Sequence, residues 1–328
     1  MEPASRPQLS VVTTMYRSAT YLEEFYRRVS QAAGPHFVST EFVFVNDGSP
    51  DPSLEVTLAL QQHDPRLRIV DLTRNFGHHH AIVAGLEHAT GDFVFLIDCD
   101  LEEEPESLPK LFAALRDNDA DAAYGVQIDR KGGFVERWGG IIAYKLIGAL
   151  SAGDLRLPSN MMLARLMTRR YVDRFLDHRE SAIVFSGLAA TTGFRQVAVP
   201  LRKSSRMTTT YKLRQRIGML VWTLTAFTDR PLHYIAYLGL TILIASLGYV
   251  VYLIAMYLGY HNVPAGYTSV AVSIWFLGGL ILFSIGIVAI YLSVVFVEVK
   301  NRPRYLVRRI YEATKAELHD SHLSAPGS

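Results

Sequence analysis

The sequence predicts an α/β fold, a mostly parallel sheet with helices on both faces, followed by an amphipathic helix and a hairpin of two transmembrane helices. Two observations predict it. Apolar strand-like runs and amphipathic helical patterns alternate through residues 1–130, which is typical of parallel sheets covered by helices. The stretch 234–297 contains no Asp, Glu, Lys or Arg, so it is unsuited to an ordinary soluble surface.

The predicted elements alternate regularly along the amino-terminal part. Apolar runs that end in polar or turn residues indicate strands, at 9–15, 42–45, 67–70 and 93–97. Amphipathic patterns indicate helices, at 21–33, 54–62, 81–88 and 105–115. No internal repeat or low-complexity tract interrupts this order.

Three of the predicted strands end in polar residues. Thr14 stands at the end of the first, Asn46-Asp47-Gly48-Ser49 follows the second, and Asp98-Cys99-Asp100 follows the apolar run 93–97. Because the carboxyl ends of parallel strands lie along one edge of a sheet, these residues are expected to converge on one crevice. Asp47 could there accept hydrogen bonds from a base or ribose, although Asn-Asp-Gly-Ser alone is also a common turn.

Asp98 and Asp100 are candidate metal ligands. Alternation along a strand would point both carboxylates to one side, with Cys99 on the other. Such hard oxygen ligands suit Mg²⁺ or Mn²⁺, usually together with substrate phosphates. An isolated Asp-x-Asp pattern is short, and the alternative is that Asp98 caps a helix while Asp100 is solvated.

Two membrane spans are expected in the charge-free stretch. The break at 261–266 divides it into halves that each exceed the roughly 20 residues needed to cross a bilayer. Basic residues flank the stretch on both sides, and the loop between the halves has none, so the positive-inside rule places both termini, and with them the α/β domain, in the cytoplasm, at the inner (plasma) membrane. The flanking residues are Lys203, Arg206, Lys212, Arg214, Arg216, Arg230, Lys300, Arg302, Arg304, Arg308 and Arg309.

The expected domains are a cytoplasmic α/β domain (1–205), an amphipathic helix (206–230), two transmembrane helices (231–298) and a basic cytoplasmic tail (299–328). Apolar residues from 211 to 228 recur at helical spacing against Lys212, Arg214 and Arg216. This pattern is typical of a helix at the membrane interface, although the same helix could pack only on the α/β domain.

The single Cys99 fits a reducing compartment, and a net charge of +2 gives no sign of nucleic-acid binding.

An ordered series of motifs carries a family resemblance. The motifs are Leu9-Ser10-Val11-Val12, Val45-Asn46-Asp47-Gly48-Ser49, Arg74-Asn75-Phe76-Gly77-His78, Ala84-Gly85-Leu86, Gly91-Asp92, Asp98-Cys99-Asp100-Leu101-Glu102 and Pro105-Glu106. With the hairpin, the chain from 9 to 304 resembles glycosyltransferase family 2 enzymes of the polyprenyl-phosphate glycosyltransferase type. The resemblance implies a GT-A fold, a nucleotide-diphosphate sugar donor, a divalent metal (Mg²⁺ or Mn²⁺) and inverting transfer to a lipid phosphate. It also implies oligomer formation.

The resemblance also assigns residues. It makes Asp98 and Asp100 the metal-binding pair, with Asp100 at the catalytic centre, Glu102 a further metal ligand and Asp47 a nucleotide contact. Thr14 and Tyr16 stand in the family's nucleotide-binding opening, which lacks its usual carboxylate here.

A family aspartate near the acceptor has two candidate positions. Asp154 matches the family's local string, whereas alignment on residues 169–173 puts Leu163 at the aspartate's place and makes Arg165 the motif's arginine. The candidate ligands of the donor and acceptor phosphates are Arg130, Lys131, Arg137, Lys203 and Arg206.

The expected function is metal-dependent transfer of one sugar from a nucleotide sugar to polyprenyl (undecaprenyl) phosphate at the cytoplasmic face. Two alternatives stay open: extension of a lipid-linked saccharide or cell-surface glycan, and a non-catalytic membrane subunit that retains the fold. His78-His79-His80 is interpreted as a loop-to-helix junction, because adjacent helical side chains point about 100° apart and cannot converge on one ion.

Overall fold

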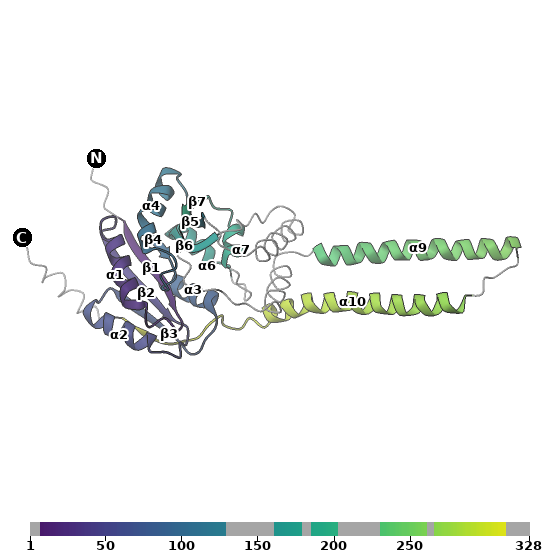
Figure 1. The fold of residues 1–328 in the computed structure, drawn as a ribbon, viewed down its shortest axis with the longest axis horizontal. Helices are drawn as coiled ribbons and strands as arrows, with labels where there is room; N and C mark the ends of the chain where they lie inside the picture. The colour runs from purple at the N-terminus through teal and green to yellow at the C-terminus, as the bar shows by residue number, and fades with distance from the viewer. Residues whose placement is uncertain (1–6, 129–160, 179–184, 203–229, 261–265, 313–328) are drawn as a thin grey trace, which may run out of the picture. The chain divides into compact units, whose positions relative to one another are not determined.

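The computed structural model describes residues 7–128, 161–178, 185–202, 230–260 and 266–312. They fall into two compact units (Figure 1). The sheet unit holds the described residues up to 202 together with 302–312, and the helical unit holds 230–260 and 266–301.

The sheet unit is built on one eight-stranded sheet in the order β7-β5-β6-β4-β1-β2-β3-β8. The strands β4, β1, β2 and β3 pair in parallel, β6 and β8 pair antiparallel to β4 and β3, and β5 pairs antiparallel to β6 and parallel to β7. This confirms the mostly parallel sheet. The strands are β1 (Gln8–Met15), β2 (Ser39–Asn46), β3 (Leu67–Leu72), β4 (Phe93–Leu96), β5 (Ala122–Gln127), β6 (Met161–Thr168), β7 (Gln196–Leu201) and β8 (Val307–Tyr311).

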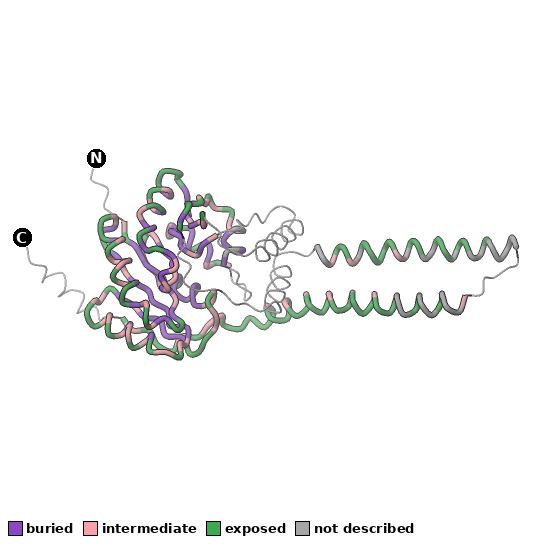
Figure 2. The backbone as a smooth tube through the Cα atoms, viewed as in Figure 1, coloured by how far each residue is buried: buried purple, intermediate pink, exposed green. Residues whose placement is uncertain are grey.

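Helices cover both faces of this sheet, as the sequence predicts. Side chains from alternate strand positions form two separate buried cores, one beneath α1, α2 and α4 and the other beneath α3, α6 and α7. The buried stretches of the backbone run mainly through the strands (Figure 2). The helices are α1 (Leu22–Ala33), α2 (Ser53–His63), α3 (His78–Glu87), η1 (Pro105–Ser107), α4 (Leu108–Asp117), α6 (Arg169–Leu176) and α7 (Phe185–Thr191).

The strand β8 closes one edge of the sheet, an element that the sequence analysis did not predict. Its Ile310 pairs with Val70 of β3. The amide of Thr73 donates to Leu306 O at 2.9 Å, and Arg308 Nη2 donates to Thr73 O at 2.7 Å. Because an uncovered edge strand presents unpaired backbone groups, the segment that follows the last long helix protects β3.

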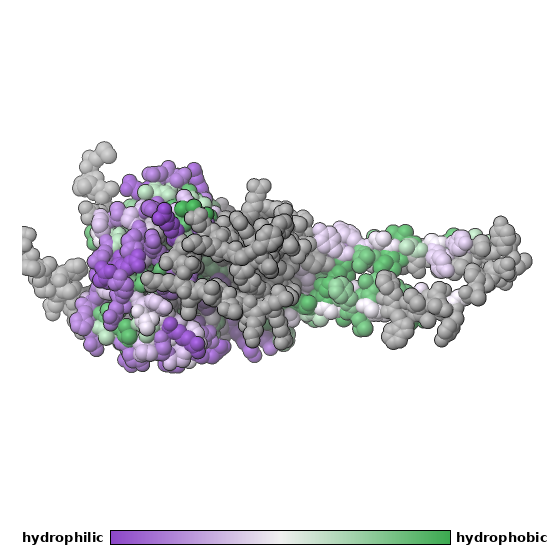
Figure 3. Space-filling model, viewed as in Figure 1, coloured by the Kyte–Doolittle hydropathy of each residue, from purple (hydrophilic) through white to green (hydrophobic). Residues whose placement is uncertain are grey.

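The helical unit consists of α9 (Arg230–Tyr260) and α10 (Tyr267–Val299), which contact each other. Among the described residues, the segment Leu277–Val299 is long and apolar enough to cross a membrane, and α9 holds a shorter apolar segment, Leu232–Ile242. Hydrophobic residues gather along the described parts of these helices (Figure 3). Large exposed apolar side chains such as Leu282 and Phe283 mark α10 as a surface for lipid or protein. The second span stays a prediction, and the expected amphipathic helix at 206–230 lies almost wholly outside the described residues.

The packing of α3 on the sheet depends on Gly85. A Cβ atom at this position would lie 2.4 Å from Val12 Cγ1 of β1. We expect Gly85→Ala to destabilise the sheet unit by about 1–3 kcal/mol, because overpacking forces a buried helix away from its strand. At about 2–4 °C for each kcal/mol, the melting temperature in detergent should fall measurably. Gly34→Ala is the matched control, because a Cβ there comes no closer than 3.7 Å to a neighbour, and an equal loss in both variants would contradict this account.

Candidate active site

The acidic residues that follow β4 lie in a turn. The strand ends at Leu96, the amide of Ile97 donates to Val12 O at 3.2 Å, and a turn follows at residues 99–100. Because β4 ends before Asp98, the alternation of side chains along a strand does not determine the directions of the Asp98 and Asp100 carboxylates. Asp98 keeps 32% of its side chain exposed, so its carboxylate is accessible at the carboxyl edge of the sheet.

The turn continues through a strained residue. Leu101 has a φ of +60°, which costs a non-glycine residue about 1–3 kcal/mol and persists only where the surroundings enforce it. Within the turn, the amide of Glu102 donates to Asp100 Oδ1 at 2.9 Å. At the end of the turn, the buried carboxylate of Glu103 accepts hydrogen bonds from the amides of Leu163 at 2.9 Å and Ala164 at 2.6 Å. The acidic turn (residues 97–103) is thereby joined to β6.

The ends of β1 and β4 meet at His78, the first residue of α3. Its Nδ1 lies 3.1 Å from Thr14 Oγ1, and its Nε2 lies 3.7 Å from Asp98 Oδ1. Partial burial lowers the pKa of His78, against the opposing effect of Asp47 and Asp100. The structure thus brings the predicted residues Thr14 and Asp98 together through a histidine to which the sequence analysis gave no role at the site.

Cys99 faces away from the candidate site. Its buried thiol donates to Thr14 O at 3.2 Å, and burial raises the pKa of this thiol to about 12. A protonated, inward-facing thiol is neither a nucleophile nor a soft metal ligand. Cys99 is therefore a packing residue between β1 and the acidic turn.

Asp47 at the end of β2 is buried and holds the neighbouring loop. Its Oδ1 accepts from the amide of Phe76 at 2.7 Å and its Oδ2 from that of Gly77 at 3.0 Å. Burial raises the pKa of this carboxyl, while the two N–H groups act in the opposite direction. Gly48 has a φ of +59°, and a Cβ there would lie 2.5 Å from backbone atoms of Arg74 and Asn75. Asp47 therefore shapes the edge of the crevice, and its contact with a nucleotide stays a prediction.

Tyr16 lies beyond the end of β1 and is 45% exposed. The guanidinium of Arg17, whose φ is +57°, lies 5.6 Å from the Tyr16 ring centroid. The amide of Arg17 donates to Ser49 Oγ at 2.7 Å. The loops after β1 and β2 are thus joined, and the exposed Tyr16 ring lies beside Arg17 near the carboxyl end of β1.

Arg165 is a buried part of β6. It is 2% exposed, its Nε donates to Leu163 O at 3.1 Å, and its guanidinium stacks on Phe185 at 4.4 Å. Burial lowers the pKa of Arg165 to about 10, so the group is still cationic at neutral pH. Arg165 pairs with Leu96 of β4. Its contacts therefore stabilise β6 at the point where β4 ends. A direct role in catalysis stays a prediction.

The chemistry of the acidic turn fits a hard divalent cation. Within the described ranges, no group of three His, Cys, Asp or Glu side chains is placed to hold one ion. Protein sites for Mg²⁺ often use only one or two carboxylates, because substrate phosphates and waters supply the remaining oxygens. Asp98 and Asp100 offer such oxygens at the sheet edge. Their assignment and that of Glu102 as ligands remain predictions.

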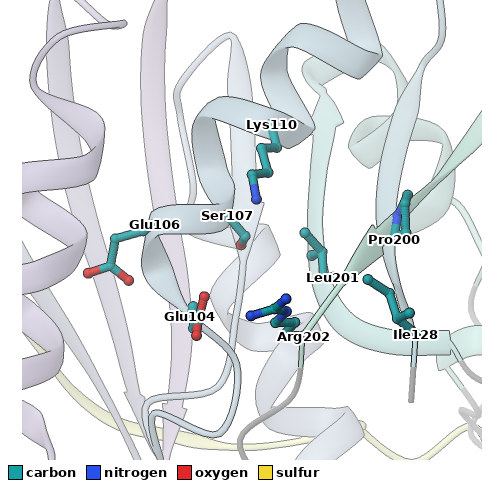
Figure 4. A pocket seen from close by; sticks show the side chains of 8 residues that line it. All are labelled: Glu104, Glu106, Ser107, Lys110, Ile128, Pro200, Leu201 and Arg202. Atoms are coloured by element: carbon teal, nitrogen blue, oxygen red, sulfur yellow. The ribbon is translucent and has the colours of Figure 1, made fainter. Parts of the chain in front are cut away.

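A cavity of about 590 Å³ lies beside the acidic turn, between the start of α4 and the ends of β5 and β7 (Figure 4). Lys110 and Arg202 line it together with Glu104 and Glu106, and Glu106 forms a two-point ion pair with Arg28 at 2.8 and 2.6 Å. Because the lining carries both signs of charge, its charge alone does not select a ligand.

Six predicted site residues lie outside the described residues. They are Arg130, Lys131, Arg137, Asp154, Lys203 and Arg206.

Comparison with known proteins gives a consistent result. The family model described as "Glycosyl transferase family 2" matches residues 10–179. A Mycobacterium tuberculosis protein described as a glycosyltransferase is 44% identical over 93% of this chain and 88% of its own length. The SfII prophage-derived bactoprenol glucosyl transferase of Shigella flexneri is 31% identical over 92% of this chain and 98% of its own. Among solved structures, a Pyrobaculum calidifontis mannosyltransferase in complex with GDP-Man and Mn²⁺ matches with a TM-score of 0.45 at 18% identity, over 91% of this chain and 88% of that one.

The hydrogen bonds of Asp47 predict the effect of removing one acceptor. In Asp47→Asn, the amide group would place a donor against the N–H of Phe76 or Gly77. A buried donor left without a partner costs about 1–3 kcal/mol, so the melting temperature should fall. The control is Asp117→Asn, at the exposed end of α4. Equal melting temperatures for Asp47→Asn and the unmodified protein would show that this carboxylate does not hold the loop.

Proposed function

Because the chain belongs to glycosyl transferase family 2, we propose that it transfers one sugar from a nucleotide-diphosphate sugar to a polyprenyl phosphate. The observation that carries this proposal is the accessible acidic turn at the carboxyl edge of a parallel sheet, beside the ends of β1 and β2. Nucleotide ligands bind at this edge in open α/β sheets. The bactoprenol glucosyl transferase relative, matched over nearly its whole length, supports the lipid acceptor.

In this proposal the protein contributes binding, orientation and charge. A divalent ion held by Asp98 and Asp100 would neutralise the departing diphosphate when bound. His78 lies between Thr14 and Asp98, with its ring nitrogens 3.1 Å from Thr14 Oγ1 and 3.7 Å from Asp98 Oδ1. The exposed Tyr16 ring would stack on the base, and the loop held by Asp47 would border the nucleotide.

The acceptor chemistry needs cations more than it needs a base. A phosphate monoester has a second pKa of about 6, so the acceptor is mostly a dianion at cytoplasmic pH. It can attack the anomeric carbon with inversion as the nucleoside diphosphate leaves. Leu163, at one candidate position of the family aspartate, has no acidic side chain, and this chemistry accounts for an enzyme without a base there. Asp154 remains the alternative base. The candidate phosphate ligands are Arg130, Lys131, Arg137, Lys203 and Arg206.

Membrane attachment would bring the site to its lipid acceptor. The apolar segment Leu277–Val299 supports one span, and the uncharged stretch of α9 supports a second. The strand β8 returns the chain to the sheet unit directly after α10. Two spans with both termini at the cytoplasmic face therefore belong to the proposal, as does assembly into a homo-oligomer.

The direct test is product formation by the purified full chain in detergent. Mn²⁺, undecaprenyl phosphate and a panel of nucleotide sugars are supplied, and lipid products are followed by mass spectrometry. We expect a lipid carrying one sugar from one donor, and its loss with a chelator. A folded protein that gives no product with any donor, or a product with several sugars, would overturn the proposal.

The acidic turn predicts the outcome of two substitutions. Asp98→Asn and Asp100→Asn should each lower transfer by about 100-fold or more, because each weakens charge stabilisation of the leaving diphosphate. Membrane insertion should be unchanged. Initial rates with saturating donor and acceptor measure the effect, and Asp117→Asn serves as the exposed control. Full activity in either site variant would remove that residue from the proposed metal site.

A further inference from the structure

The acidic turn is attached to β6 at both of its ends. Before the turn, Leu96 of β4 pairs with Arg165 in the antiparallel ladder. At the end of the turn, Glu103 reaches the same strand and accepts hydrogen bonds from the amides of Leu163 at 2.9 Å and Ala164 at 2.6 Å. The residues between these attachments include Asp98, Asp100 and the strained Leu101.

Glu103 differs from its neighbours in burial and in contacts. It is 3% exposed, whereas Glu104 is exposed and lines the adjacent cavity. A buried carboxylate is tolerated only where donors satisfy it, and here two consecutive backbone amides do so. Arg165 adds a buried cation near Glu103. Its Nε and Nη2 donate to the carbonyls of Leu163 and Met162 at 3.1 and 3.3 Å, which secures the part of β6 that Glu103 binds.

The positive φ of Leu101 makes the attachment of Glu103 to β6 important for the shape of the acidic turn. A residue at +60° returns to a more favourable conformation unless the chain on both sides is held. The β4–β6 ladder holds one side and the Glu103 carboxylate holds the other. Without the second attachment, the backbone that carries Asp98 and Asp100 would be held at one end only.

We infer that Glu103 is a positioning residue that sets the geometry of the divalent-cation site at Asp98 and Asp100 by clamping the acidic turn to β6. The inference rests on the proposed function, because the proposed function supplies the cation. Glu103 touches neither cation nor substrate in this account. Its effect passes through the backbone of the turn.

The test measures Mn²⁺ binding to the purified full chain, by the electron paramagnetic resonance signal of free Mn²⁺, without substrate turnover. Glu103→Gln keeps the size of the side chain but sets an N–H donor against a backbone donor. Glu103→Asp keeps the charge but is too short to reach both amides. Loss of a group that orients metal ligands typically weakens metal affinity by about 10–100-fold, and we expect a loss in this range for both variants.

Two controls separate positioning from charge and from general stability. Glu104→Gln removes the same charge one residue away, and Leu115→Ala weakens the buried core near the end of α4; both should bind Mn²⁺ as the unmodified chain does. Unchanged affinity in the Glu103 variants would overturn the inference, as would equal losses in the Leu115→Ala control or failure of both Glu103 variants to fold. If the unmodified chain itself binds no Mn²⁺, the proposed metal site fails instead.

Discussion

The parallel pairing of β4, β1 and β2 brings three strand ends to one edge of the sheet, and every contact of the candidate site depends on that pairing. Cross-strand bonds continue past the strand ends. Asp47 N donates to Met15 O at 3.1 Å, and the Cys99 thiol donates to Thr14 O at 3.2 Å. Polar side chains therefore project from a rigid edge. Rigid elements hold functional groups with a precision that loops alone cannot give.

The mixed half of the sheet makes a different contribution. The strand β6 runs antiparallel to β4, so its beginning lies beside the end of β4 and next to the acidic turn. This arrangement lets one backbone segment, Met162–Ala164, bind two side chains. Its amides donate to the Glu103 carboxylate, and its carbonyls accept from the Arg165 guanidinium. The exposed His78 and the half-buried Asp98 lie beside these buried supporting contacts, where the Asp98 carboxylate is accessible.

The sequence was sufficient to predict the sheet edge but not the contacts that shape it. Short apolar runs ending in Thr14, Asp47 and Asp98 identify the carboxyl ends of parallel strands, because strand period and turn residues are local signals. The turn at residues 99–100 could not be told from a continued strand, since the amides that bind Glu103 just after it belong to β6, about 60 residues further along the chain.

The same limit applies to Glu103, Asp47 and β8. Three consecutive glutamates, Glu102 to Glu104, carry no local signal that the middle one is buried. The carboxylate of Asp47 was expected to face a nucleotide, and the amides that bind it come from a loop 29 and 30 residues further on. The short strand β8 lies in a basic segment and pairs with β3, from which it is separated by most of the chain. Contacts between distant segments decide all three cases.

In the proposed reaction, the acidic turn would hold a divalent cation and the donor diphosphate together. Crystals of the full chain grown with Mn²⁺ and a nucleoside diphosphate, with data collected at the manganese absorption edge, test it most directly. The account predicts one anomalous peak within bonding distance of Asp98 or Asp100 and of the diphosphate oxygens. A bound diphosphate with manganese elsewhere, or with both of these carboxylates turned away from it, would contradict the account.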